Sequence, residues 1–282
     1  MIKHIGVLGA GQMGNGIAHT FAQYGFEVLL YDIGQPQLDK ALATIRQNLE
    51  RQAKKGTIPE EVVSATLGRI RTTLTLADFH SVDFAVEAAT ENEALKLEIF
   101  RQLDTIAKPG AILASNTSSI PITKIASVTK RPEQVIGMHF MNPVPLMKLV
   151  EVIRGHATSD TTFAVTADLV VKLEKEMAVA QDYPGFIVNR ILMPMLNEAI
   201  FALYEGIASA EDIDLGMKLG TNQPMGPLTL ADFIGLDTCL AIMNVLYDGF
   251  KDPKYRPCPL LVKMVNAGYL GKKSGRGFYV YQ

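Results

Sequence analysis

Residues 4–32 contain the feature that most restricts what this chain can fold into. A short apolar strand leads into a glycine-rich loop, and a segment whose apolar residues recur every four positions follows. That spacing indicates an amphipathic helix, which Gly25 ends. The next strand closes with Asp32. The loop itself reads Gly9-Ala10-Gly11-Gln12-Met13-Gly14, a G-x-G-x-x-G pattern.

Each glycine of this loop has a physical task in a strand–loop–helix–strand unit. The first permits a tight turn, the second lets backbone approach a pyrophosphate, and the third allows the helix to pack closely on the strand. The helix N-terminus offers unpaired N–H groups to the anion. Asp32 lies 23 residues after Gly9, where a carboxylate can accept hydrogen bonds from a ribose 2′-hydroxyl. The loop residues Gly9 to Gly14 and Asp32 therefore predict dinucleotide binding.

The acid also bears on which dinucleotide binds. The negative charge of Asp32 would repel a 2′-phosphate, so NAD is favoured over NADP. FAD is a rival for the same loop, and a glycine-rich turn used only for packing is the structural alternative. The proton-transfer residues described below favour a nicotinamide over a flavin.

Strand-like and helical segments alternate over the first 183 residues and then give way to helical segments. This pattern predicts an α/β, Rossmann-type, mostly parallel sheet domain over 1–183, followed by a smaller all-α domain over 184–282. The strands are expected at 82–89, 111–116, 135–140, 148–153 and 177–182, and the helices between them at 91–107 and 161–175. Further helices are expected at 186–207, 209–219, 228–247 and 257–267, before the C-terminal GRGFYVY.

Composition narrows the class of protein. Apolar residues make up 48% of the 282-residue chain and the formal net charge is −2, which is typical of a globular protein and not of a nucleic-acid binder. The only cysteines, Cys239 and Cys258, are too few for a disulfide framework, so a reducing, cytoplasmic location is expected. No run of 18 apolar residues predicts a membrane span, and the N-terminal segment is interpreted as a strand rather than a signal peptide.

The helical part is unusually apolar for its size. We expect its helices to bury part of this surface against a second copy of the chain, giving a homodimer. The alternative is that they are buried against the first domain alone.

Six motifs carry a resemblance that spans residues 5–281. The chain resembles the 3-hydroxyacyl-CoA dehydrogenase family, in particular its short bacterial 3-hydroxybutyryl-CoA members. The resemblance implies an NAD-dependent enzyme acting on an acyl-CoA, without a fused hydratase. The motifs are GAGQMGNGIA (9–18), LASNTSS (113–119), GMHFMNPVPLMKLVEV (137–152), PGFIVNR (184–190), NQPMGPLTLADFIGLD (222–237) and KKSGRGFYVY (272–281).

His139 and Glu151 flank a Pro-Val-Pro turn that joins two predicted strands. Histidine suits proton transfer near neutral pH, and His139 stands near a strand end, where open α/β sheets bind ligands. A carboxylate bonded to one ring nitrogen would fix the ring and its tautomer. The resemblance implies that His139 is the base for the C3 hydroxyl and that Glu151 orients it. The alternatives are a satisfied buried histidine and a plain surface charge.

The resemblance assigns further residues to the site. Ser118 would contact substrate and nicotinamide, Asn189 the thioester or 3-oxygen region across an interdomain cleft, and Asn142 the nicotinamide. Each of the three could instead be a turn or helix-cap residue. Glu91, Lys96 and Lys273 match cofactor contacts, although an acid at the start of a helix, like Glu91, is favoured there in any case.

Coenzyme A carries phosphates and needs positive charge, which the segment 48–56 supplies. Lys55 matches a family contact to the CoA group, and Asn48 stands where the family has serine. Solvated charges at a helix C-terminus are the alternative. No cluster of residues has metal-ligand spacing, so no metal is expected.

Two other functions fit parts of this pattern. One is an enzyme of the same fold that acts on a free hydroxy acid or a sugar acid. The other is a redox-sensing NAD-binding protein without turnover. The polar loop NQPMG (222–226) and the basic patch 51–55 favour CoA over a free acid. The set of Ser118, His139, Glu151 and Asn189 favours catalysis over sensing.

Overall fold

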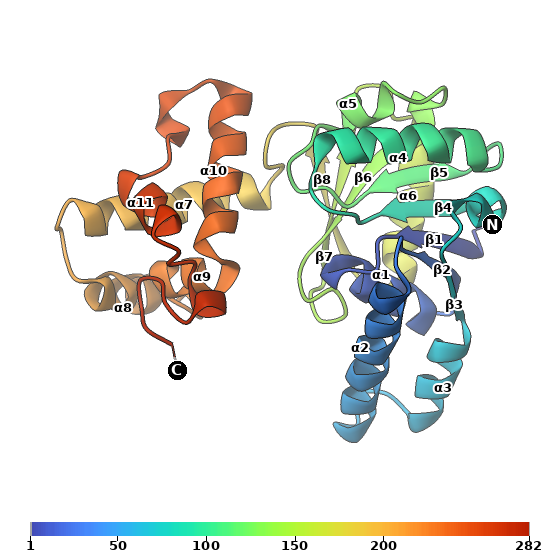
Figure 1. Ribbon diagram of the computed structural model, residues 1–282, viewed down its shortest axis with the longest axis horizontal. Coiled ribbons are helices and arrows are strands. Elements are labelled where there is room, and N and C mark those ends of the chain that lie inside the picture. The colour runs from blue at the N-terminus through green and yellow to red at the C-terminus, as the bar shows by residue number, and fades with distance from the viewer. Residues whose placement is uncertain (1, 282) are drawn as a thin grey trace. The chain divides into compact units, whose positions relative to one another are not determined.

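The computed structural model describes residues 2–281, and the chain forms two compact units, residues 1–183 and 184–282. The first unit is built on one eight-stranded sheet in the order β3-β2-β1-β4-β5-β6-β7-β8 (Figure 1). Neighbouring strands are parallel except β6 and β7, which are antiparallel. The strands are β1 (His4–Leu8), β2 (Glu27–Tyr31), β3 (Ile70–Thr73), β4 (Phe84–Glu87), β5 (Ile112–Ser115), β6 (Val135–Phe140), β7 (Leu149–Arg154) and β8 (Glu176–Gln181). The expected mostly parallel, Rossmann-type sheet is confirmed.

The central strands are buried along their length because helices cover the sheet. Helices α1 (Gln12–Gln23), α2 (Gln35–Lys54) and α6 (Asp160–Lys172) share one apolar core with the strands, to which Phe21, Leu38 and Leu169 contribute. The remaining helices of this unit are α3 (Glu60–Gly68), α4 (Glu93–Ile106) and α5 (Ile122–Ala126). Side chains cap two of these helices: Asn92 accepts a hydrogen bond from the Leu95 amide in α4, and Ser159 accepts one from the Thr162 amide in α6.

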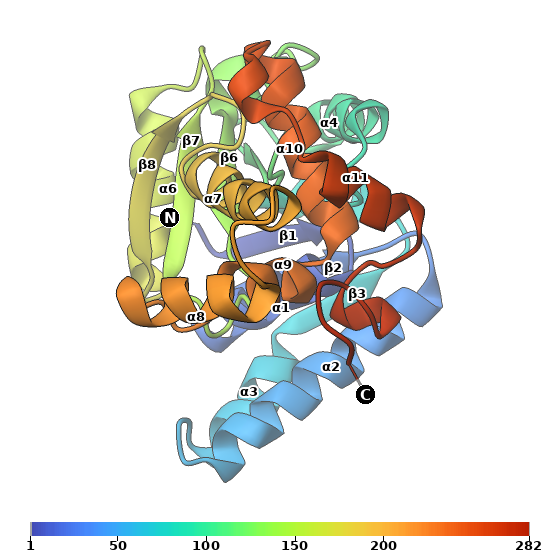
Figure 2. The same ribbon diagram turned by 90° about the vertical axis from the view of Figure 1, so that its left-hand side faces the viewer.

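Helix α3 and strand β3 were not expected from the sequence. The strand IRTT has only four residues and none is fully buried, so it carries little apolar signal. In space, α2 and α3 lie side by side and extend together beyond the sheet (Figures 1 and 2).

The second unit is helical, with α7 (Val188–Tyr204), α8 (Ala210–Gly220), α9 (Pro227–Ile234), α10 (Leu236–Phe250) and α11 (Pro259–Asn266). The single helix expected at 228–247 is wrong: it is two helices, α9 and α10, bent by 96° at Gly235. Gly235 has φ +101°, a backbone conformation that a helix cannot contain. Within residues 2–281 no single helix is long and apolar enough to cross a membrane, and only this bent pair passes that test jointly.

The C-terminal segment GRGFYVY folds back onto α9 rather than forming a strand, with isolated bridges at Arg276. The buried Asp232 carboxylate accepts hydrogen bonds from the amides of Phe278 and Tyr279 and from the Tyr281 hydroxyl. A Cβ on Gly277 would overlap that carboxylate, so glycine is required there. Asp232 of α9 therefore holds residues 278–281 in place.

Candidate active site

The glycine loop joins β1 to α1 and has the geometry of a phosphate-binding turn. Gly9 has φ +101°, and a Cβ on Gly14 would overlap the Gly9 carbonyl oxygen, so both positions need glycine. A Cβ built on Gly11, in contrast, meets nothing within 4 Å, so the loop presents open backbone there. Gly11 is also the N-cap of α1 and supplies no side chain to its amides. The loop therefore leaves a helix N-terminus available to an anion.

Asp32 follows β2 at the same edge of the sheet. Its carboxylate accepts hydrogen bonds from the amides of Ala10 (2.7 Å) and Ile33 (2.8 Å). The bond from Ala10 ties Asp32 to the glycine loop. It lines a cleft of about 580 Å³ together with Gly11 and Ala89. Each carboxylate oxygen can accept a further hydrogen bond, so the residues fit the adenosine ribose of a dinucleotide.

His139 and Glu151 are direct partners across the antiparallel pair β6–β7. His139 Nδ1 lies 2.7 Å from Glu151 Oε2, and the Glu151 side chain is fully buried. An ionised carboxylate only accepts hydrogen bonds, so it holds the ring proton on Nδ1 and makes Nε2 the basic nitrogen. The structure thus brings together the two residues that the sequence analysis paired.

The turn between β6 and β7 is fastened at three points. Lys175 donates from Nζ to the carbonyls of Val144 and Met147, at 2.7 Å each. The Val144 side chain packs at Gly16 of α1, where a Cβ would come within 2.9 Å of it. Asn142 Oδ1 accepts a hydrogen bond from Gln12 of the glycine loop at 3.2 Å. Asn142 is therefore held next to the start of α1. Burial lowers the pKa of Lys175, a residue that the sequence analysis did not single out.

Ser118 lies in the loop after β5, and Glu91 holds that loop in place. Glu91 Oε1 accepts hydrogen bonds from the amides of Ser118 (3.0 Å) and Ser119 (3.1 Å) and from the hydroxyls of Thr117 (2.5 Å) and Ser119 (2.7 Å). The Ser118 hydroxyl is 3.4 Å from the same oxygen. Glu91 thus has a structural contact with the Ser118 loop in addition to its predicted contact with a cofactor.

Lys96 is 1% exposed and pairs with two acids. Its ammonium lies 2.6 Å from Glu87 Oε1 and 3.4 Å from Glu91 Oε2. Ser115 donates a hydrogen bond to the other Glu87 oxygen at 2.7 Å. Sequence reasoning missed Glu87, although an acid inside the apolar strand FAVE was a usable signal, because a buried charge needs a partner.

Two predicted site residues belong to the second unit. Asn189 stands in the first turn of α7. Lys273 lies in the C-terminal segment and donates from Nζ to Asp237 at 2.7 Å. In residues 2–281 no group of three or more His, Cys, Asp or Glu side chains is placed to hold a metal ion.

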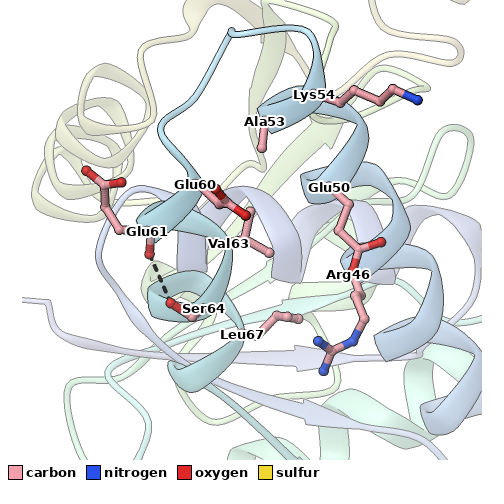
Figure 3. Close-up of a pocket in the computed structure, with 9 residues that line it drawn as sticks. All are labelled: Arg46, Glu50, Ala53, Lys54, Glu60, Glu61, Val63, Ser64 and Leu67. Carbon is pink, nitrogen blue, oxygen red and sulfur yellow. Dashed lines mark hydrogen bonds between the residues drawn. The ribbon is translucent and has the colours of Figure 1, made fainter.

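Asn48 and Lys55 stand seven residues apart at the end of α2, two turns along one face. A cavity of about 800 Å³ lies between α2 and α3 (Figure 3). The α2 residues that line it are Arg46, Glu50, Ala53 and Lys54. At 3.6 residues per turn all four lie roughly 120–160° around the helix from Asn48. The cavity and the predicted CoA face are therefore different surfaces of the same helix.

The sheet order, the glycine loop and Asp32 define a dinucleotide-binding protein of the doubly wound α/β class. Comparison with protein families is more specific. Residues 4–183 match the 3-hydroxyacyl-CoA dehydrogenase NAD binding domain, and residues 185–281 match the C-terminal domain of the same enzymes.

Individual relatives match over full length. A Bradyrhizobium diazoefficiens protein called 3-hydroxybutyryl-CoA dehydrogenase is 57% identical over 282 residues, covering 100% of this chain and 96% of the relative. A Bacillus subtilis protein called probable 3-hydroxybutyryl-CoA dehydrogenase is 57% identical over 281 residues, covering 100% and 98%. The crystal structure of (S)-3-hydroxybutyryl-CoA dehydrogenase from Ralstonia eutropha has a TM-score of 0.98 and 52% identity, covering 100% of both chains. This chain belongs to the 3-hydroxyacyl-CoA dehydrogenase family, so the expected family and the NAD cofactor are confirmed.

Proposed function

We propose that this chain is an NAD-dependent (S)-3-hydroxyacyl-CoA dehydrogenase that interconverts 3-hydroxybutyryl-CoA and acetoacetyl-CoA. The observation that carries the proposal is the 2.7 Å contact of His139 with Glu151 at the sheet edge that also carries the glycine loop. The names of the full-length relatives support the choice of substrate. Bound at this edge, the nicotinamide would supply the hydride acceptor.

Residues of this chain then transfer the proton of the substrate hydroxyl. His139 Nε2 accepts the proton of the C3 hydroxyl during oxidation and returns it to the 3-keto oxygen during reduction. Glu151 keeps the ring oriented and stabilises the imidazolium. Ser118 and Asn142, held by Glu91 and Gln12, position the reacting groups from the first unit. We propose that Asn189 contributes its amide to substrate binding.

We propose the remaining contacts on the same basis. The loop residues Gly9 to Gly14 and Asp32 bind NAD, with Glu91, Lys96 and Lys273 as further cofactor residues. Asn48 and Lys55 bind the CoA group, where Lys55 offers an exposed cation for phosphate. The first unit is thus the NAD-binding domain and the second the substrate and dimerisation domain.

Steady-state assays with acetoacetyl-CoA test this function. NADH oxidation with acetoacetyl-CoA is expected to have a kcat/KM at least roughly 100-fold above that with free acetoacetate, because remote CoA contacts contribute to binding the transition state. Replacing NADH by NADPH is expected to lower kcat/KM about tenfold or more, because Asp32 repels the 2′-phosphate. Turnover of free acetoacetate at the same efficiency would indicate a hydroxy-acid enzyme, and no turnover of either substrate would indicate an NAD-binding sensor.

We further propose that the protein is a homodimer through its C-terminal helices. Large apolar side chains that are exposed near the end of α7 and along α8 support this, since exposed apolar surface is often buried in an interface. They are Tyr204, Ile207, Leu215 and Leu219. The two cysteines are free, which supports a reducing, cytoplasmic location.

The mass in solution tests the dimer. Light scattering after gel filtration is expected to give about twice the 30.8 kDa of one chain. Leu219→Asp is expected to give monomers, because it places a charge in the interface. Val171→Asp is the matched control: Val171 is 72% exposed, close to the 71% of Leu219, but lies in α6 of the first unit. A monomeric unaltered protein, or an undisturbed dimer in Leu219→Asp, would contradict the proposed interface.

A further inference from the structure

The end of β4 and the segment that follows it carry more acids than cations. Glu87 and Glu91 both pair with one cation, Lys96, so two carboxyl groups share a single amine. The two acids differ in burial. The Glu87 side chain is fully buried, whereas that of Glu91 is 37% exposed. The excess negative charge is therefore accessible at the ligand-binding edge of the sheet through the Glu91 carboxylate.

Glu91 is held as an anion in a fixed position. Burial alone would raise the pKa of its carboxyl, but the charge of Lys96 and the hydrogen bonds from Thr117, Ser119 and Ser118 outweigh burial and hold that pKa below its usual range. Because one oxygen receives the loop donors, the carboxylate has little freedom to turn. A fixed charge exerts a stronger field than one that swings into solvent.

The sheet order places this charge on the nicotinamide half of the site. A dinucleotide crosses the switch point of a doubly wound sheet, here between β1 and β4. Asp32 lies on the β2 side and fits the adenosine ribose, so the nicotinamide falls on the side of β4, β5 and β6. His139 lies on β6 of that same half, as proton transfer next to the nicotinamide requires.

We propose that the Glu91 carboxylate makes the site discriminate between the two redox forms of NAD, favouring the oxidised one. The oxidised nicotinamide ring is a cation and the reduced ring is neutral, so a nearby fixed anion attracts only the first. The inference rests on the NAD-dependent function proposed above. It adds a specificity for cofactor charge to the loop-holding contacts of Glu91.

The dissociation constants of NAD⁺ and NADH for Glu91→Gln test the idea. NADH binding is followed by its fluorescence and NAD⁺ binding by displacement of NADH. Glutamine keeps an oxygen acceptor for the amides of Ser118 and Ser119 but removes the charge. The dissociation constant of NAD⁺ is expected to rise about tenfold and that of NADH less than about twofold, the size expected for a partly screened unit charge near a protein surface.

Glu93→Gln is the matched control. Glu93 opens α4, two residues after Glu91, and its exposed carboxylate pairs with Lys124 at 2.7 Å. This variant removes one negative charge from the same part of the chain and is expected to leave the ratio of the two dissociation constants unchanged. Equal weakening of both cofactors in Glu91→Gln would show that Glu91 only holds the loop. The proposal would also be overturned if Glu91→Gln left both dissociation constants unchanged, or if Glu93→Gln changed their ratio as much as Glu91→Gln did.

A measurement on the unaltered protein covers the case in which Glu91→Gln does not fold. The ratio of the dissociation constant of NADH to that of NAD⁺ is expected to fall as salt rises from about 20 mM to about 0.5 M, because a partly exposed charge is screened. A preference that does not change with salt would contradict the proposal. Failure of the unaltered protein to bind either cofactor would instead refute the NAD-dependent function itself, so the two failures are distinguishable.

Discussion

His139→Gln is expected to lower kcat for acetoacetyl-CoA reduction on the order of 10²–10⁴-fold, with little change in the dissociation constant of NADH. Glutamine can still bond to Glu151 but has no nitrogen that can shuttle a proton near neutral pH. The loss should therefore fall on the chemical step. Stopped-flow measurement of NADH oxidation in a single turnover reports that step directly.

Two further variants make this result specific. His156→Gln changes an exposed histidine of the same unit and should leave kcat unaltered. Glu151→Gln keeps the shape of the partner but removes its charge, so kcat should fall while cofactor binding persists. A His139→Gln enzyme with the activity of the unaltered protein would refute the proposed proton transfer.

Lys96→Met is expected to reduce the free energy of unfolding by about 3–5 kcal/mol, because it leaves the fully buried Glu87 carboxylate without its cation. Urea titration measures the loss. Since the chain has two compact units, hydrogen exchange at the amides of Ala85 and Val86 in β4 should assign the loss to the first unit.

The double variant Glu87→Gln, Lys96→Met separates charge from packing. The glutamine oxygen can accept the hydrogen bond of the Ala89 amide, and its NH2 group can donate to the Ser115 hydroxyl oxygen, so no cation is needed and most of the lost stability should return. Lys124→Met is the surface control, because its exposed pair with Glu93 is worth about 0–1 kcal/mol. A Lys96→Met variant no less stable than Lys124→Met would show that this buried pair contributes nothing to stability.

The fold was predictable where short patterns determine it. The glycine loop and Asp32 predicted the first strand–helix–strand unit, and short apolar runs predicted five more strands at the right places, although the last of these, β8, is mostly exposed. The predicted helix 228–247 failed because its apolar pattern continues through Gly235, and only the backbone shows that α9 and α10 turn there. Strand β3 was missed because an exposed, four-residue edge strand leaves little pattern to recognise.

The candidate active site was only partly predictable from the sequence. The pairing of His139 with Glu151 followed from two strands joined by a turn, and the register places the two residues opposite each other. The support for that pair was not predictable. Lys175 reaches the carbonyls of the turn from 28 or more residues away, and main-chain carbonyls have no sequence signature. An acid in an apolar strand marked Glu87 as unusual, but its partners were not predictable because they come from α4 and β5.

The antiparallel contact of β6 with β7 has a consequence for how the proposed proton-transfer pair is assembled during folding. His139 and Glu151 are separated by 12 positions. In contrast, β2 and β4 each pair with β1 only after a long crossover connection. Closing such a short hairpin costs little chain entropy, so the His139 imidazole and the Glu151 carboxylate can meet in a local event. The proposed proton-transfer pair therefore needs only one short segment to form, whereas the glycine loop and Asp32 come together through longer-range contacts.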